Sequence, residues 1–270
     1  MELKNLLTGI EMDEELARRV EEVMPQLNTP EIDEQIKGLM NIETAPAAYQ
    51  WIDTNLKDED NLRMLACSLE AARRQHDVYA QKGIDDLVYF ETMKCFTRFL
   101  GERKRNTGEV CFDRGWWTYR QTSMQLFRIG ELEYEFFVYD EKPVLSIHIP
   151  SDAHFSKALV GESLREARAF MAKFYPEYED VDYFCETWLL SPTLRELLHP
   201  ESNIRDFQDR FEIFKIDEEA PDYLSWLFGA SYTADLTTLK EETSLQRAVK
   251  AFVVNGGKIG VAYGYIRNAF

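Results

Sequence analysis

The chain has 270 residues, of which 45% are hydrophobic and 13% aromatic, so it can bury a core and wholesale disorder is excluded. Its formal net charge is −17, and a negative field repels DNA, RNA and anionic membranes, which argues against all three as partners. The four cysteines are dispersed and form no Cys-x-x-Cys pair, so neither a disulfide framework nor a metal site is expected.

The N-terminal segment and the lack of a long apolar run indicate the cellular location to expect. Residues 1–22 are acidic and lack the apolar region of a signal peptide. The sequence has no run of about 18 apolar residues, so no membrane span is expected. A reducing cytoplasm is the expected location, and the length suits one large domain or two ordinary ones.

The first hundred residues show helical periodicity. A long helix is predicted to begin at Asp58 or Asp60, either of which is a candidate N-cap, and to end at Gly83. Its apolar residues recur at steps of three and four. Further helices are predicted over residues 13–24, 30–40, 45–56 and 84–105.

The pattern changes at about Asn106. Residues 116–130 and 131–140 alternate between apolar and polar positions, which predicts two strands. Gly130 and Glu131 between them predict a hairpin. The remaining predicted elements are a strand over 142–150, a helix over 156–176, a strand over 181–190, a short helix opened by Ser191 and Pro192, a strand over 206–216, a helix over 244–257 and a strand over 258–266.

This order predicts an α+β protein with two domains. Residues 1–106 form a helical N-terminal domain, and residues 107–270 form a mixed, mainly antiparallel sheet flanked by helices. A hairpin that feeds a strand–helix–strand crossover is the feature that makes the sheet mixed.

Several stretches together resemble one family. They cover roughly residues 75–265 and include "GWWTYRQTSMQLFRIGELEYE", "IHIPSDA", "SLREARAFMAKFYPEY", "CETWLLSPTLRELL" and "TSLQRAVKAFVVNGG". In this order they resemble the bacterial GNAT-like acyltransferases that join a helical N-terminal domain to a GNAT-like C-terminal domain. The resemblance implies a GNAT-like sheet over residues 107–270.

The resemblance also implies a site for an acyl-CoA co-substrate, either acetyl-CoA or another acyl-CoA. In such folds the sheet splays open, and here the splay falls between residues 144–150 and 183–190. The acyl-CoA lies in the splay, and its pyrophosphate rests on the turn "SDAHFS". The implied cofactor-binding residues are Leu145, Ile147 and Ile149 in the strand, Ser151, Ala153 and Ser156 in the turn, and Asn203.

The turn departs from the glycine-containing pattern of better-known acetyltransferases. Glycine lets the backbone approach phosphates closely, whereas this turn has none and carries a negative charge at Asp152. The N-terminus of the following helix still offers N–H groups and its dipole, and Ser151 and Ser156 offer hydroxyls. For Asn203, a structural cap or turn is the alternative to a ligand contact.

Transfer of an acyl group to an amine needs a proton acceptor for the amine and donors for the oxyanion. Glu186 is a carboxylate in a mostly apolar strand, where burial would favour a catalytic role. The alternative is a strand-end glutamate that reaches solvent or an arginine. His148 is a second candidate base, and its alternative is a core histidine with a satisfied hydrogen bond. Cys185 is either an acylated nucleophile or a small inert hydrophobe.

The sequence therefore favours an acyl-CoA-dependent N-acyltransferase, such as an N-acetyltransferase, with direct transfer to an unidentified small-molecule or peptide amine. The alternative is a non-catalytic GNAT-like binding module that has lost CoA, which the glycine-poor turn and Asp152 support. Fold alone does not separate the two, because one fold carries many functions.

Overall fold

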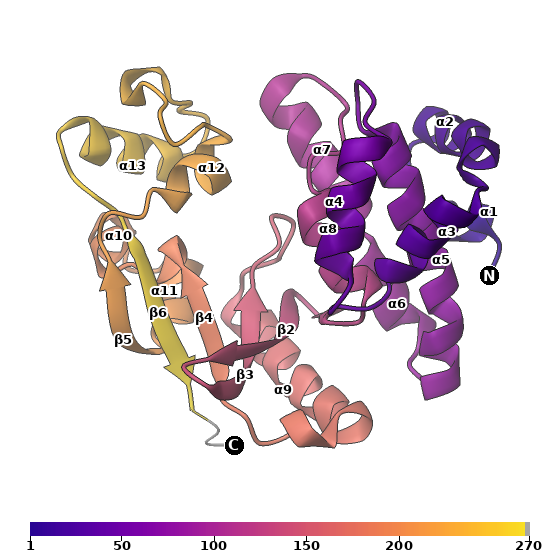
Figure 1. The fold of residues 1–270 in the computed structure, drawn as a ribbon. Helices are drawn as coiled ribbons and strands as arrows, with labels where there is room; N and C mark the ends of the chain where they lie inside the picture. The colour runs from indigo at the N-terminus through magenta and orange to yellow at the C-terminus, as the bar shows by residue number, and fades with distance from the viewer. Residues whose placement is uncertain (268–270) are drawn as a thin grey trace. The chain divides into compact units, whose positions relative to one another are not determined.

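A computed structural model describes residues 1–267. The chain divides into two compact units. The first comprises Met1–Ile129 and Glu133–Glu135, and the second comprises Gly130–Leu132 and the chain from Phe136 onward. In Figure 1 the helices of the first unit run from indigo to magenta and most of the second unit is orange to yellow.

The first unit is built from helices, as predicted. They are α1 (Leu3–Gly9), α2 (Glu14–Val23), the 3-10 turn η1 (Met24–Leu27), α3 (Pro30–Gly38), α4 (Ala45–Asn55), α5 (Leu62–Lys82), α6 (Asp86–Met93), α7 (Cys95–Thr107) and α8 (Gly115–Thr122). Lys94 divides the single helix expected over residues 84–105 into α6 and α7. The short strand β1 (Leu126–Ile129) follows α8.

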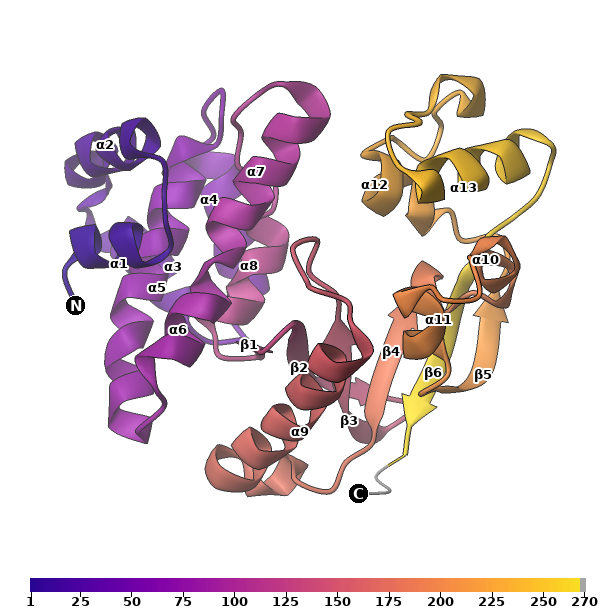
Figure 2. The ribbon, with the colours of Figure 1, turned by 180° about the vertical axis from the view of Figure 1, so that it is seen from behind.

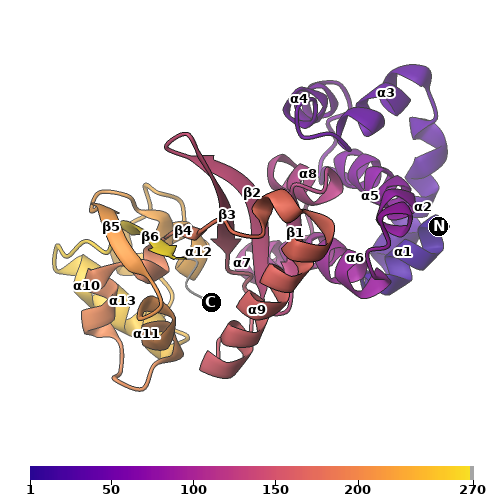
Figure 3. The same ribbon diagram turned by 90° about the horizontal axis from the view of Figure 1, so that it is seen from below.

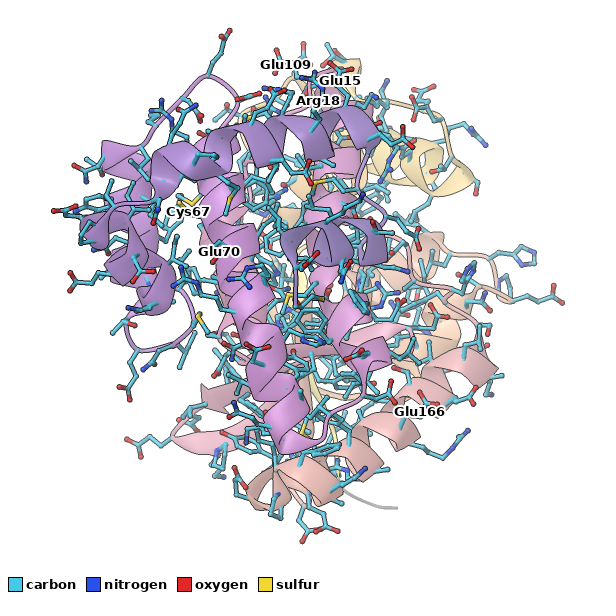
Figure 4. The ribbon with its side chains drawn as sticks, turned by 90° about the vertical axis from the view of Figure 1, so that its right-hand side faces the viewer. Glu15, Arg18, Cys67, Glu70, Glu109 and Glu166 are labelled. Atoms are coloured by element: carbon cyan, nitrogen blue, oxygen red, sulfur yellow. The ribbon has the colours of Figure 1, made fainter. Side chains whose placement is uncertain are left out.

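The helix α5 is the longest of the described part of the first unit and is buried along most of its length. It ends at Gly83 as predicted, where a φ of 74° requires glycine. Asn61, rather than Asp58 or Asp60, stands at the N-cap position, but Asp58 caps the first turn from outside the helix, since its Oδ2 accepts a hydrogen bond of 3.1 Å from the Arg63 N–H. Figure 4 labels Cys67 and Glu70 on this helix, one turn apart. Burial, followed by the charge of Glu70, raises the pKa of the Cys67 thiol to about 12.

The prediction of a strand over residues 116–130 is wrong in its first half. Residues Gly115–Thr122 form α8, and only Leu126–Ile129 form a strand. The buried residues of α8 include Thr118, Gln121 and Thr122, which are spaced three and four apart and are at most 1% exposed. Because polar residues form the buried face of α8, the helical period is absent from the apolar pattern.

The sheet runs in the order β1-β2-β3-β4-β6-β5. Its strands after β1 are β2 (Leu132–Tyr139), β3 (Lys142–His148), β4 (Tyr183–Thr187), β5 (Glu212–Asp217) and β6 (Val261–Ile266). β3 and β4 are parallel, whereas β6 is antiparallel to both β4 and β5. The predicted fold class, a mixed sheet flanked by helices, is confirmed, and Figure 3 shows β4, β6 and β5 side by side.

The helices of the second unit are α9 (Lys157–Phe174), α10 (Pro192–Leu197), α11 (Asn203–Gln208), α12 (Asp222–Phe228) and α13 (Ser244–Val254), with 3-10 turns η2 (Pro176–Tyr178), η3 (Trp188–Leu190) and η4 (Leu236–Thr238). Ser156 and Ser191 accept hydrogen bonds that cap α9 and α10, as their positions in the sequence indicated. The strand expected over residues 206–216 is partly wrong, since its first residues belong to α11.

The sheet has two faces with different coverage. Tyr183 lies on one face, and its hydroxyl donates to the Leu164 carbonyl of α9 at 2.7 Å, so α9 covers that face (Figure 2). Phe184 lies on the other face, in a buried cluster with residues of α12 and α13 such as Leu224 and Val249. The residues that follow Phe184 along β4 therefore alternate between these two environments.

Candidate functional site

The strands β3 and β4 pair over a short distance and then part. Leu145 is in register with Tyr183, and Ser146 with Phe184, and among the described residues the register has no later pair. By contrast, β4 stays paired with β6 as far as Thr187. The opening between β3 and β4 thus begins after Ser146 and Phe184, within the region that the family resemblance implies.

The first residues of this opening carry a buried thiol. Cys185 is 0% exposed, and its Sγ donates to the Ile147 carbonyl oxygen at 3.3 Å. This thiol donates to a carbonyl oxygen that would accept a hydrogen bond from a backbone N–H if the two strands stayed paired. Burial raises the pKa of the Cys185 thiol far above its ordinary value, which opposes a nucleophilic role.

The backbone groups near the opening are only partly available. The Leu145 N–H donates to the Asp182 carbonyl at 3.1 Å, and the Ile147 carbonyl accepts from Cys185. Since N–H groups alternate in direction along a strand, the N–H groups of Ile149 and Glu186 point toward the opening. Of the three residues of β3 and its extension expected to bind cofactor, Ile149 is thus the one beyond the paired region.

The two candidate bases lie on the same face of the sheet. His148 and Glu186 each follow the paired residues Ser146 and Phe184 by two positions, and the side-chain period of a strand is two. The burial that would favour a catalytic role is not found at Glu186, because its side chain is exposed, as in the alternative of a strand-end glutamate that reaches solvent. His148 is half-buried. Both side chains lie on the face opposite α9, where the strands diverge.

Glu186 has a hydrogen-bond donor that the sequence analysis missed. The Tyr263 hydroxyl donates to Glu186 Oε1 at 2.9 Å, and the two residues are directly opposite each other in the β4–β6 ladder. Burial, followed by this hydrogen bond and the charge of Glu186, raises the pKa of Tyr263. Asp222 at the start of α12 also has a raised pKa, first because of burial and then because of Glu186.

Several backbone N–H groups of the turn between β3 and α9 already donate to acceptors within the protein. Ala153 donates to the Pro150 carbonyl at 3.1 Å, and Ser156 donates to the His154 carbonyl at 2.9 Å. The His154 N–H donates to Glu131 Oε2 at 2.7 Å, so a second carboxylate besides Asp152 lies at this turn. A pyrophosphate site at this turn therefore depends on the N–H groups of the first turn of α9, which have no intrahelical acceptor.

Basic side chains stand near that helix start. Arg210, in the loop after α11, donates from Nη2 to the Lys157 carbonyl at 2.7 Å. Its Nε is buried and has no hydrogen-bond partner among residues 1–267. An added Cβ at Gly161 would lie 3.5 Å from a guanidinium nitrogen of Arg165, so that side chain also reaches the first turns of α9. Arg210 was missed because nothing local in the sequence indicates which helix it reaches.

The predicted residues of the turn and of α11 lie in neighbouring segments. The rings of Phe155 and Phe207 are 4.8 Å apart, which holds α11 beside the start of α9. Ser151 and Asn203 are exposed, with Asn203 the first residue of α11. The Ser156 oxygen accepts the capping bond from the Leu159 N–H at 3.3 Å, which leaves its hydroxyl proton for another acceptor.

Two general features bear on function. Within residues 1–267, no group of three or more histidine, cysteine, aspartate or glutamate side chains has an arrangement suited to a metal ion. In the same range, no helix combines the length and the apolar character that crossing a bilayer requires.

Comparison with known proteins identifies the family. Residues 126–266 match the GNAT-like C-terminal domain, and residues 1–124 match the N-acyltransferase N-terminal domain. The chain therefore belongs to the GNAT-like acyltransferases with this two-domain arrangement, as the sequence resemblance indicated. No curated protein matches the sequence.

Solved structures with the same fold are acyltransferases. One is an acyltransferase in complex with decanoyl-CoA and teicoplanin, with a TM-score of 0.72 and 20% identity over 99% of this chain and 100% of that chain. Another is an acyltransferase in complex with CoA and 10C-teicoplanin, with a TM-score of 0.72 and 19% identity over the same shares. A mutant acyltransferase with octanoyl-CoA has a TM-score of 0.72 and 20% identity, again over 99% and 100%. At these identities the likeness shows the fold.

Proposed function

We propose that this protein is an acyl-CoA-dependent N-acyltransferase that transfers the acyl group directly to an amine. The observation that carries the proposal is the early end of β3–β4 pairing after Ser146 and Phe184, while β4 remains paired with β6. A parallel pair that stays closed has no free backbone groups for a ligand. An open pair presents the N–H groups of Ile149 and Glu186, which suit the amides of a pantetheine arm and a developing oxyanion.

The proposed phosphate site lies at the start of α9. The helix N-terminus favours anions through its unpaired N–H groups and its dipole. Arg210 supplies a positive charge there, and the Ser156 hydroxyl remains able to donate. We keep Ser151, Ala153 and Asn203 as proposed cofactor-binding residues, because they are neighbours of this site. The charges of Asp152 and Glu131 oppose binding, so Arg210 has to offset them.

The proposed chemistry needs one base and no covalent enzyme intermediate. Glu186 or His148 accepts a proton from the amine, whose nitrogen attacks the thioester carbonyl carbon. The C–N bond forms, the C–S bond breaks, and the electron pair leaves with the CoA sulfur, which is then protonated. We favour Glu186 because its position is fixed by Tyr263, with His148 on the same sheet face as the second candidate. The raised pKa of Cys185 supports direct transfer.

The acyl chain and the acceptor are proposed from relatives. Structures with this fold hold octanoyl-CoA or decanoyl-CoA, so we extend the expectation of acetyl-CoA to chains of that length. One of those structures holds teicoplanin together with decanoyl-CoA, which supports a small-molecule or peptide amine as the acceptor here. The net charge of −17 supports an enzyme without nucleic acid or membrane as partner, and a cytoplasmic location remains part of the proposal.

Calorimetry and a thiol-release assay test the proposal. The protein is titrated with CoA, acetyl-CoA, octanoyl-CoA and decanoyl-CoA, and release of free CoA is then followed with a panel of primary amines. We expect binding of at least one acyl-CoA, and amine-dependent release that Glu186→Gln lowers about 100-fold or more. Glu212→Gln, which changes an exposed glutamate of β5, is the matched control.

The result also separates the enzyme from the non-catalytic module. Binding without amine-dependent release would favour the module. No heat and no thermal shift at millimolar acyl-CoA would contradict both the cofactor and the transferase. If Glu186→Gln is fully active, His148→Gln decides whether the other candidate is the base.

A further inference from the structure

Three residues form a row across neighbouring strands of the second unit. In the β4–β6 ladder Glu186 is opposite Tyr263, and in the β5–β6 ladder Tyr263 is opposite Lys215. Directly opposite residues in a sheet have side chains on the same face, close enough to interact. The row therefore joins a carboxylate, a phenol and an ammonium group on the face opposite α9.

The ring of Tyr263 is held from several sides. The Lys215 Nζ lies 4.2 Å from the ring centroid, a cation–π distance. The rings of Tyr139 and Phe184 have centroids 6.3 and 6.4 Å from that of Tyr263, and Tyr263 is only 9% exposed. A ring with this packing has little freedom, so its hydroxyl presents a fixed donor to the exposed Glu186 side chain.

The geometry points to Tyr263 as the positioning residue for the catalytic carboxylate of Glu186, an inference that rests on the proposed function. The Tyr263 hydroxyl donates a hydrogen bond to Oε1 of Glu186 at 2.9 Å, which fixes the rotamer of the carboxylate. The other oxygen, Oε2, is then left to accept the proton of the amine. An exposed glutamate has several rotamers in water, and each misplaced rotamer lowers the population of the reactive arrangement.

Other groups act on Glu186 or Tyr263 from the elements around them. Asp222 on α12 is a like charge near Glu186, and Asp217 on β5 is a negative charge near Tyr263. Further ionisable side chains on or beside this face are Lys215, Tyr139, His148 and Tyr265.

The test is the steady-state kinetics of Tyr263→Phe, which keeps the ring and removes the hydroxyl. We expect kcat to fall about tenfold while the KM for acyl-CoA stays unchanged, since a hydrogen bond to a charged group is lost. Tyr265→Phe is the matched control, since Tyr265 is on the same strand and face, opposite Phe184, and is expected to change neither quantity.

A double-mutant cycle completes the test. In a Glu186→Gln background, Tyr263→Phe should have no further effect on kcat, because the positioned group is absent. An unchanged kcat in Tyr263→Phe, or an equal loss in both backgrounds, would overturn the inference and leave the proposed function intact.

A second readout is independent of activity. Carbon-13 NMR at a fixed pH follows the side-chain carboxyl resonance of Glu186, assigned by its loss in Glu186→Gln. We expect this resonance to shift in Tyr263→Phe and to stay in place in Tyr265→Phe, and an unchanged resonance in Tyr263→Phe would overturn the inference. If the parent protein transfers no acyl group, the proposed function fails, and this resonance still decides whether Tyr263 acts on Glu186.

Discussion

The thiol of Cys185 donates to the carbonyl oxygen of Ile147 at 3.3 Å, in the place where β3 and β4 stop pairing. A side chain thus satisfies a carbonyl that the parting of the strands has left without a backbone donor. The opening between the strands is stabilised by the same residue that a ping-pong mechanism would use as its nucleophile. These two roles make different predictions for the loss of the thiol.

Replacement of Cys185 by alanine should destabilise the protein and preserve transfer. The Ile147 carbonyl loses its donor, and a buried unsatisfied polar group costs about 1–3 kcal/mol. Activity at 25 °C should stay within about threefold of the parent, since direct transfer needs no enzyme thiol. Urea unfolding and the CoA-release assay measure the two effects. Cys185→Ser, which keeps a donor, is the control for stability. Loss of all activity in Cys185→Ala with the fold intact would support an acyl-enzyme instead.

Replacement of Arg210 by glutamine should weaken acyl-CoA binding about tenfold, because a charge beside the start of α9 is removed. The loss should be absent for an acyl-pantetheine, which has neither the pyrophosphate nor the 3′-phosphate. Comparison of CoA with dephospho-CoA then tells whether the guanidinium faces the pyrophosphate or the 3′-phosphate. Calorimetry measures the constants, and Lys173→Gln, at the other end of α9, is the control for net charge. Equal losses for CoA and pantetheine would place Arg210 outside the phosphate site.

Local signals in the sequence predicted local structure well. Ser156 and Ser191 were readable as helix starts and Gly83 as a helix end, because a cap depends on a few adjacent residues. The β1–β2 hairpin at Gly130 was readable for the same reason. The helix α8 was not, because its buried face carries threonine and glutamine where the pattern expects apolar residues.

The candidate site was only partly readable, because its parts meet through tertiary structure. Glu186 and His148 could be singled out as polar residues in apolar strands. Tyr263 lies 77 residues after Glu186 and reaches it only because β6 inserts between β4 and β5 in a particular register. Arg210 reaches α9 only because α11 packs beside that helix. Register and helix packing depend on the whole fold, which periodicity along the chain does not report.

Removal of one partner from the buried ion pair of the first unit should strongly destabilise the protein. The Arg98 Nη2 donates to Glu133 Oε1 at 2.6 Å, and the two side chains are 5% and 3% exposed. Arg98→Met leaves a buried carboxylate without its charge partner, and we expect a loss of about 3–5 kcal/mol in the free energy of unfolding. Urea unfolding followed by circular dichroism measures it.

Two further variants give that prediction its controls. Arg98→Met combined with Glu133→Leu removes both charges and should recover much of the loss, since a buried pair costs much to desolvate. Arg18→Ala breaks an exposed pair with Glu22, whose side chains are 60% and 62% exposed, and should cost less than about 1 kcal/mol. Equal losses for Arg98→Met and Arg18→Ala would contradict the assignment of a buried, desolvated pair.

Asp222 makes stability depend on pH in a definite direction. Burial and the charges of Glu186 and Asp217 raise the pKa of Asp222 above its ordinary value of 3.8. The folded protein therefore binds this proton more tightly than the unfolded chain, and the stabilisation from it is complete below about pH 3.8. It is lost as the pH rises through the folded pKa. Asp222→Asn should thus raise the thermal midpoint at neutral pH and leave it unchanged at low pH.

Asp235 provides a control of opposite sign for that measurement. Hydrogen bonds from Thr237 lower the pKa of Asp235, so its contribution is present above the ordinary pKa of 3.8 and is lost as the pH falls through the lower folded value. Asp235→Asn should lower the thermal midpoint at neutral pH, with the difference disappearing in acid. Thermal unfolding of both variants and the parent protein from pH 3 to pH 8 measures the two trends. The same sign of change in both variants at neutral pH would contradict the assigned environment of Asp222, which lies beside the carboxylate that we propose as the base.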